Sequence, residues 1–257
     1  MKPFRVLQFN MQFGQRWDDL DPDHAPVDLQ GTIDEIVRHD ADVILLQEVE
    51  RALPNGVQPE PPPNFGHLRQ VLRDYDSSFA YPRPDHRELP FGIGLAIFTR
   101  TPLRDTFRDD LPSPPIPFEF AGETRTPTDR LLIGAKTTIH GREVTLMNTH
   151  LLAFFMLKST SEVHGDQRSR VAQRLQRAQG PTLLAGDFNV SQHTSLIGQF
   201  AEAGFATVQQ EEVTWRRRPY VLDHVFYNRF LRCVAFSVIP TPASDHHALV
   251  ADFIFAD

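Results

Sequence analysis

The sequence predicts an α/β protein, in which strands and helices alternate along the chain. Apolar runs of strand length recur, and residues 183–189 are the clearest example, ending in Gly186-Asp187-Phe188-Asn189. Segments with apolar residues at helical spacing lie between several of these runs. Many of the runs also end in a polar side chain, and open α/β sheets bind their ligands at the carboxyl ends of their strands.

The composition is that of a chain with a sizeable core. Of the 257 residues, 40% are apolar and 20 are phenylalanine, so we expect residues 1–257 to form a single domain. The formal charge of −7 argues against a broadly basic surface for nucleic acid, although bound metal ions could meet a phosphate instead. The only cysteine, Cys233, excludes an internal disulfide and is expected in the core.

Nothing in the chain predicts a membrane span. No apolar run approaches the roughly 18–20 residues that a spanning helix needs. The first ten residues lack the apolar stretch of a signal peptide, being interrupted by Arg5 and Gln8. We therefore expect a cytoplasmic protein, or one from which a leader has been removed.

The first element is predicted to be a buried strand over residues 4–9 that ends at Asn10. Residues 27–39 follow as a helix, with Leu29, Ile33, Ile36 and Val37 on its inner face. A second strand, residues 42–48, ends at Glu48. A strand, a helix and a strand in this order predict a parallel crossover, which makes Asn10 and Glu48 neighbours. Glu48 alone could equally be a solvated strand end.

The middle of the chain combines proline-rich loops with shorter elements. Residues 12–26 are expected to be a loop with Trp17 as a wall, and residues 53–64 and 109–128 are expected to be irregular. Between the loops we expect a helix near residues 68–72 and strands at 78–81 and 92–103. His140-Gly141-Arg142 predicts a hairpin whose second strand leads to His150.

The run that follows His150, residues 151–157, has two interpretations: buried core, or an apolar wall that receives a greasy part of a substrate. A helix is expected over residues 166–179, with Val171 and Leu175 inward, and it leads into the strand at 181–187. On an extended backbone, Asp187 and Asn189 would share a face while Phe188 points into the core. A local turn capped by Asp187 and Asn189 is the alternative.

The last third is predicted to contain a helix at residues 194–203 and strands at 220–227 and 248–255. Arg216-Arg217-Arg218 could be a solvated turn or a phosphate clamp beside a site. His224 and His247 are interpreted as structural. Polar residues recur at the ends of the predicted strands. This pattern is hard to explain as surface polarity, because converging unpaired carboxylates are costly without a cation. Its members are Asn10, Glu48, His150, Asp187, Asn189, Asp223, Asp245 and His246.

Six short motifs in the chain resemble those of the endonuclease/exonuclease/phosphatase superfamily. In order they are Gln-Phe-Asn (8–10), Leu-Gln-Glu (46–48), Asn-Thr-His (148–150), Gly-Asp-Phe-Asn (186–189), Leu-Asp-His-Val-Phe (222–226) and Ser-Asp-His (244–246). Each is weak alone, but six in the right order, spread over nearly the whole chain, are specific. The superfamily includes apurinic endonucleases, pancreatic-type deoxyribonucleases, neutral sphingomyelinases and inositol polyphosphate 5-phosphatases. The resemblance implies a four-layer α/β sandwich, with two mixed sheets face to face and helices outside.

The resemblance also implies roles for the matched residues. Glu48 would bind Mg²⁺ or Mn²⁺, with Asn10 and Asp245 completing or flanking the metal site. Asp187 would deprotonate the attacking water, with Asn189 holding it. His246 would face the phosphate and be oriented by Asp223, while His150 would contact the phosphate or protonate the leaving oxygen.

The resulting expectation is a metal-dependent hydrolase of a phosphate ester, with a small or lipid-like substrate. A nuclease acting on DNA or RNA is the main alternative. A catalytically inactive binding module on the same fold is a third hypothesis, which the presence of Glu48, Asp187 and His246 disfavours. No protein partner is predicted.

Overall fold

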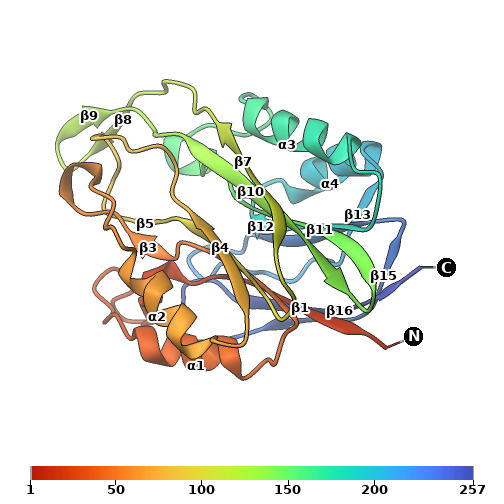
Figure 1. Ribbon diagram of the computed structural model, residues 1–257. Helices are drawn as coiled ribbons and strands as arrows, with labels where there is room; N and C mark the ends of the chain where they lie inside the picture. Colours follow the sequence, from red (N-terminus) through yellow and green to blue (C-terminus); the bar gives the residue numbers. More distant parts are fainter. Residues whose placement is uncertain (1, 257) are drawn as a thin grey trace.

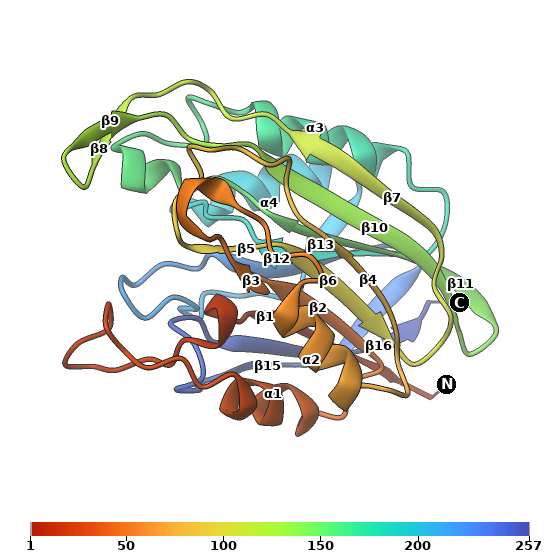
Figure 2. The same cartoon turned by 60° about the vertical axis from the view of Figure 1, so that its left-hand side comes forward.

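The computed structural model describes residues 2–256 as two six-stranded sheets packed face to face, with helices on the outside. Figures 1 and 2 show the four layers from two directions. The predicted four-layer α/β sandwich is therefore confirmed. None of the helices formed by residues 2–256 has the length and apolar character needed to span a membrane.

The first sheet contains one parallel pair, β1 with β2, and is otherwise antiparallel. In spatial order its strands are β15 (Leu231–Ile239), β16 (Ala248–Phe255), β1 (Phe4–Asn10), β2 (Val43–Gln47), β6 (Leu95–Thr99) and β4 (Asp76–Ala80). Helices α1 (Leu29–Val37) and α2 (Pro63–Val71) cover its outer face.

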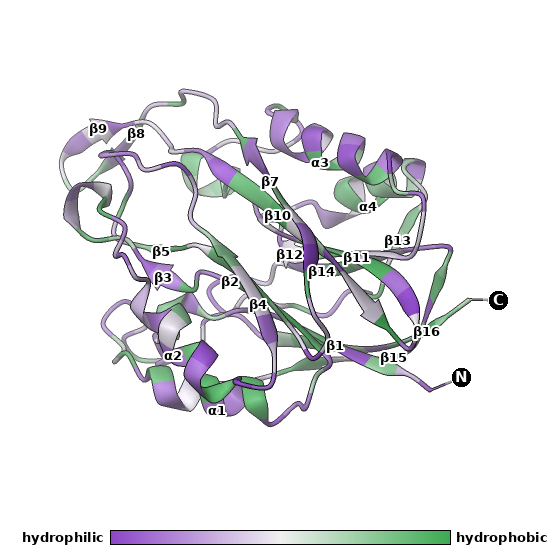
Figure 3. Ribbon diagram, in the orientation of Figure 1, coloured by the Kyte–Doolittle hydropathy of each residue, from purple (hydrophilic) through white to green (hydrophobic). Residues whose placement is uncertain are grey.

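The second sheet likewise has one parallel pair, β11 with β12. Its spatial order is β13 (Phe205–Thr207), β14 (Asp223–Asn228), β12 (Thr182–Asp187), β11 (Arg142–His150), β10 (Arg130–Ile139) and β7 (Arg104–Leu111). Helices α3 (Asp166–Gln176) and α4 (His193–Glu202) cover its outer face. Figure 3 shows α3 as largely hydrophilic. Its apolar residues Val171 and Leu175 are buried, as predicted.

Short elements at one end of the sandwich complete the fold. They are the pairs β3 (Glu50–Arg51) with β5 (Gly92–Ile93) and β8 (Phe118–Phe120) with β9 (Glu123–Arg125), and the 3₁₀ turns η1 (Gln12–Gly14), η2 (Pro54–Gly56) and η3 (Phe154–Leu157). Figure 1 shows β3, β5, β8 and β9 on its left-hand side, away from the two ends of the chain on the right.

The core forms three apolar layers because alternate side chains of each strand point to opposite faces. The central layer lies between the sheets and includes Val6, Val43, Leu183 and Val225. Outer layers join the first sheet to α1 and α2, and the second sheet to α3 and α4.

The predicted crossover and hairpin are confirmed, and several details differ. The β1–α1–β2 unit has parallel strands, and β10 and β11 pair around His140 and Gly141. Val37 is 45% exposed rather than inward, because it is the last residue of α1. The predicted loop 109–128 is partly wrong: β7 extends to Leu111, and the β8–β9 hairpin follows. Cys233 is only partly buried, because it lies at a bulge on the edge strand β15.

Candidate active site

Polar side chains occupy the inner faces of the strands at one end of the sandwich. On β1 the inward residues change from Val6 in the central core to Asn10 at the strand end. On β12 the inward Leu183 and Ala185 precede Asp187, which lies opposite His150 of β11 and Asp223 of β14. Strand register and period-two alternation therefore bring these side chains to one place.

Asp187 is the centre of this group. Its Oδ2 accepts a hydrogen bond from Asn10 Nδ2 at 3.0 Å. The same oxygen lies 3.5 Å from His150 Nε2 and 3.6 Å from His246 Nε2. Its Oδ1 accepts a hydrogen bond from the Asn189 backbone N–H at 2.9 Å. Each oxygen of the buried Asp187 carboxylate is therefore held in place by a hydrogen bond.

Glu48 lies beside Asp187, immediately after β2. Asn10 Nδ2 donates to Glu48 Oε1 at 3.1 Å, which realises the predicted proximity of Asn10 and Glu48, and His150 Nε2 is 3.8 Å from the same oxygen. The backbone of Glu48 is left-handed, with φ of 49°. Gly92 of β5 passes so close that a Cβ atom there would lie 2.5 Å from Glu48 Cβ, so only glycine fits.

Asp223 and His246 form a buried pair. The Nδ1 atom of His246 and Oδ2 of Asp223 are 2.7 Å apart, which leaves His246 Nε2 facing Asp187. Gln8 Nε2 donates to the other Asp223 oxygen at 2.8 Å. Both oxygens of Asp223 are therefore occupied, and the orientation of the His246 ring is fixed.

Three amide side chains support the site and were not predicted. Gln8 Nε2 donates to Gln47 Oε1 at 2.7 Å, and Gln47 Nε2 donates to Asn148 Oδ1 at 2.7 Å. Asn148 Nδ2 in turn donates to the backbone carbonyl of Leu46 at 2.8 Å, across the two sheets. Strand alternation could have predicted two of them, because Gln8 and Asn148 precede Asn10 and His150 by two positions and lie on the same strand face.

Asp245 lies at the edge of the group and is held by an arginine. Its Oδ2 accepts hydrogen bonds from Trp215 Nε1 at 3.2 Å and Arg217 Nε at 2.8 Å, and its Oδ1 is 4.0 Å from His246 Nε2. Arg217 also pairs with Asp23 of the 12–26 loop at 2.6 Å. The middle residue of the arginine triplet is thus neither a solvated turn residue nor free to clamp a phosphate as it stands.

Asn189 and His224 show where strand alternation stops and where it holds. The strand ends at Asp187, and Asn189 adopts a left-handed φ of 51°, so alternation does not determine its direction. Asn189 Nδ2 donates to the backbone carbonyl of Leu151 at 3.1 Å. Phe188 is buried in the outer core as predicted. His224, next to the inward Asp223, packs on the opposite side against His193 and Phe226.

Burial and neighbouring charges shift the pKa values of the central residues. Burial raises the pKa of Asp187 to about 8; Asp223 and Glu48 act in the same direction, and His246 opposes them. Burial raises the pKa of Glu48 to about 7, assisted by the charge of Asp245. Burial lowers the pKa of His150 well below its usual value. For His246, burial is outweighed by Asp223 and Asp187, and the pKa lies well above its usual value.

The donor atoms of the group fit a divalent cation. Glu48, His150 and Asp187 offer ligand atoms that all lie within 4.8 Å of one another. Glu48 contacts the neutral amide of Asn10 and the neutral ring of His150, neither of which offsets the cost of burying its negative charge as a cation would. Asn10 presents its amide nitrogen to both carboxylates, and Asp245 Oδ2 accepts hydrogen bonds from Trp215 and Arg217. A metal site formed by Asn10, Glu48 and Asp245 stays a prediction.

An aromatic cluster lies beside His246. The ring of Trp215 is 6.3 Å from that of His246, and it contacts Phe155 at 5.4 Å and Tyr220 at 6.2 Å between centroids. Phe155 belongs to the 151–157 run, but Phe154 is buried and stacks on His164. The 151–157 run therefore has two parts: Phe154 belongs to the core, whereas the half-buried Phe155 packs against Trp215 and Tyr220 beside His246.

Comparisons with known proteins agree with this fold. A UPF0294 protein of Yersinia pseudotuberculosis is 31% identical over 137 residues, which cover 50% of this chain and 51% of that protein. The chain thus spans about half the length of the curated relatives it matches. Among solved structures, an endonuclease/exonuclease/phosphatase from Beutenbergia cavernae superposes with a TM-score of 0.71 at 22% identity, covering 100% of this chain and 72% of that one.

Two further solved structures share the fold at lower identity. The mannosyl-6-phosphatase Bt3783 of Bacteroides thetaiotaomicron has a TM-score of 0.70 at 17% identity, covering 98% of this chain and 100% of that one. The D. rerio TDP2 structure, complexed with a single-strand DNA product, has a TM-score of 0.65 at 17% identity, covering 99% and 100% of the two chains. The model of the Endonuclease/Exonuclease/phosphatase family matches residues 7–246, and the chain belongs to that family.

Proposed function

We propose that this protein is a divalent-metal-dependent phosphoesterase, which hydrolyses a phosphate ester or diester by attack of an activated water. The observation that carries the proposal is Asp187, a buried carboxylate whose Oδ2 lies within 3.0–3.6 Å of Asn10, His150 and His246. Its pKa is raised to about 8, so it can accept a proton near neutral pH.

The proposed roles follow from the contacts. Asp187 accepts the proton of the attacking water, and the backbone N–H of Asn189 fixes its other oxygen. His246, kept protonated by Asp223, faces the phosphoryl group and stabilises its negative charge. His150 is neutral and contacts the substrate as the second imidazole of the site. The Asn189 side chain helps to hold the water.

Glu48 is the proposed ligand of the cation, and the ligand atoms of His150 and Asp187 lie within 4.8 Å of its carboxylate, close enough to act on a substrate held beside the cation. Mg²⁺ or Mn²⁺ suits carboxylate ligands of this kind. When bound, the cation supplies positive charge to the phosphoryl oxygens and the leaving oxygen. Asn10 orients both carboxylates, and Asp245, held by Arg217, flanks the group.

A small or lipid-like substrate is favoured over a long nucleic acid. Phe155 and Tyr220, both half-buried, pack against the buried ring of Trp215 next to His246, and this apolar cluster suits a greasy or flat leaving group. The formal charge of −7 disfavours extended contacts with a phosphate backbone.

A single catalytic domain over residues 1–257 and a cytoplasmic location stay predictions.

A nuclease is the second candidate. It is favoured by the fold shared with D. rerio TDP2, whose structure holds a single-strand DNA product, and stacking of bases on the same aromatic cluster would suit single strands. An inactive binding module on the same fold would bind such ligands without turning them over.

Parallel assays distinguish these functions. We expect a chromogenic phosphodiester and sphingomyelin to be hydrolysed faster than single-stranded or duplex DNA and inositol phosphates, in each case with Mg²⁺ and not with excess EDTA. Asp187→Asn supplies the background rate. Faster cleavage of single-stranded DNA would establish the nuclease, and no turnover of any substrate would favour the binding module.

A further inference from the structure

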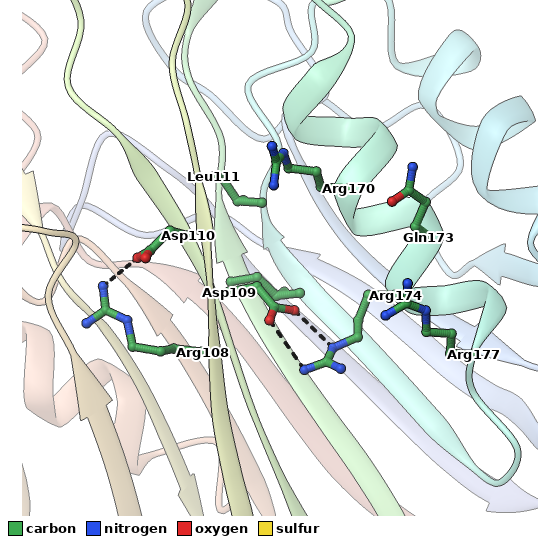
Figure 4. Close-up of a pocket in the computed structure, with 9 residues that line it drawn as sticks. Arg108, Asp109, Asp110, Leu111, Arg170, Gln173, Arg174 and Arg177 are labelled. Atoms are coloured by element: carbon green, nitrogen blue, oxygen red, sulfur yellow. Dashed lines mark hydrogen bonds and ion pairs between the residues drawn. The ribbon is translucent and has the colours of Figure 1, made fainter.

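A polar cavity lies on the outer face of the second sheet, between β7 and α3. Its volume is about 440 Å³. Figure 4 shows the arginines of α3 on one side and the strand β7 on the other. The charged residues that line it are Arg108, Asp109, Asp110, Arg170, Arg174 and Arg177. Four of these six are arginines, in a chain whose formal charge is −7.

This cavity is separate from the active site. Asp109 pairs with Leu132, which pairs with Thr149, the residue before His150. Leu132 lies in the outer core layer with α3, whereas its neighbour Leu131 lies in the central layer, on the same sheet face as His150. The cavity and the catalytic side chains thus lie on opposite faces of one sheet.

The charges around the cavity do not cancel. Four arginines and two aspartates line it, which leaves two positive charges in excess. Arg108 pairs with Asp110 at 2.7 Å, and Arg174 pairs with Asp109 at 3.0 Å. Within residues 2–256, Arg170 and Arg177 form no ion pair, and both side chains are exposed at the cavity.

Arg174 is held in place between these two free arginines. Its guanidinium lies 3.9 Å from the centroid of the Phe107 ring while its Nε contacts Asp109. Arg170 lies one helical turn before it, and Arg177, the residue that caps the carboxyl end of α3, lies about one turn after it, so the three follow one face of α3 to its end. Stacking fixes the planar group before any ligand arrives and reduces the entropy lost on binding.

We propose that this cavity binds a small phosphate-bearing anion, with Arg170 and Arg177 as its main contacts and Arg174 between them. Guanidinium groups bind phosphate oxygens in a bidentate manner. A phosphomonoester carries about −1.5 to −2 charge at pH 7, which matches the excess of two positive charges better than the single charge of a carboxylate. A cavity of about 440 Å³ exceeds a bare phosphate and suits a small organic phosphate.

The test is calorimetric titration of the full chain with phenyl phosphate, carried out in excess EDTA so that no metal assists binding at the active site. We expect one binding site per chain with a Kd of about 1 mM or tighter. The double variant Arg170→Gln/Arg177→Gln should weaken binding at least tenfold. The matched control is Arg73→Gln/Arg232→Gln, which removes the same charge at exposed positions elsewhere, and it should bind as the unmodified protein does.

Three outcomes would overturn the proposal. These are absence of binding by the unmodified protein, equal binding by the Arg170/Arg177 variant, or equal binding of benzoate, which carries one charge on the same ring. Loss of binding in His246→Ala with retention in the cavity variant would place the anion in the active site instead. The titration requires no catalysis, so its failure is distinct from failure of the proposed phosphoesterase function.

Discussion

At the scale of single residues, the site contains backbone strain next to its carboxylates. Glu48 and Asn189 have φ values of 49° and 51°, in the left-handed region that ordinary side chains avoid. Each such residue costs on the order of 1 kcal/mol. The strain at Glu48 is accompanied by the close approach of Gly92, and these two features together direct the Glu48 carboxylate towards Asn10.

Gly92→Ala tests this arrangement. The added Cβ would lie 2.5 Å from Glu48 Cβ, so Glu48 must move. We expect Mg²⁺ affinity, measured by calorimetry without substrate, to fall by about 10- to 100-fold, as for other residues that orient metal ligands. The control is Gly66→Ala, because a Cβ there meets no atom within 4 Å. Unchanged affinity in Gly92→Ala would show that the position of Glu48 does not depend on this contact.

Asp223 and His246 should act as one unit. Each single change to alanine is expected to lower kcat by about 10²–10⁴-fold, because Asp223 both orients and charges the His246 ring. The double variant should be little worse than the worse single variant, since the effects of coupled residues are not additive. Losses that multiply in the double variant would assign the two residues separate roles.

Individual site residues were predictable where strand alternation applies. Asn10 and Asp187 end strands, and Asp223 begins one, whose inward residues include Val6, Ala185 and Val225 of the central core, so pattern and register suffice to bring them together. Asn189 lies beyond the strand in a left-handed turn, and Arg217 reaches Asp245 from a loop. These positions depend on loop conformations that no periodic pattern encodes.

At the scale of elements, η3 divides the run after His150 between core and site. Phe155→Ala should raise KM for sphingomyelin several-fold and leave both the chromogenic diester and the melting temperature nearly unchanged, because only its contacts with Trp215 and Tyr220 are lost. Phe154→Ala, the neighbouring control, removes a buried ring and should cost about 3–5 kcal/mol, with uniform loss of activity. A large drop in melting temperature for Phe155→Ala would contradict the interpretation of Phe155 as part of an apolar wall for the substrate.

The β3–α2 junction makes stability depend on pH through Glu50. Burial raises its pKa from 4.5 to about 7, although its Oε1 accepts a hydrogen bond from the Phe65 backbone N–H at 2.8 Å, at the start of α2. A raised pKa means that the contribution of Glu50 to the unfolding free energy is complete below about pH 4.5 and is lost as the pH rises through 7.

Glu50→Gln should remove the loss of stability at high pH, while its side-chain oxygen still accepts the hydrogen bond from the Phe65 backbone N–H. Denaturant unfolding should show the variant equal to the unmodified protein near pH 4.5 and more stable at pH 8, by up to about 3 kcal/mol. Glu211→Gln, at an exposed position, serves as the control. An equal difference at both pH values would exclude Glu50 as the titrating group.

Elements with strong apolar patterns were predicted, and weakly patterned ones were not. The strand β7 has only Phe107 and Leu111 as apolar residues, because an edge strand exposes most of its side chains. Helix α2 begins at Pro63, five residues before the predicted start, because proline is favoured in the first turn of a helix.

At the scale of the whole molecule, the site exists only because the two sheets meet face to face. Gln8 of the first sheet binds Asp223 of the second, and Asn10 binds Asp187 across the same interface. These contacts join residues 215 and 177 positions apart. Local pattern predicts each strand but not which faces meet, so the sandwich was expected from the resemblance of the motifs and not from periodicity.

The measurement that tests the central claim most directly is hydrolysis of a chromogenic phosphodiester after exhaustive chelation, followed by return of Mg²⁺ or Mn²⁺. The unmodified protein should be inactive in excess EDTA and regain full activity with either cation. Asp187→Asn should fold normally, bind the cation, and remain about 10²–10⁴-fold slower under the same conditions. Full turnover in EDTA, or an Asp187→Asn variant that keeps half of the original kcat, would contradict a metal-dependent phosphoesterase centred on Asp187.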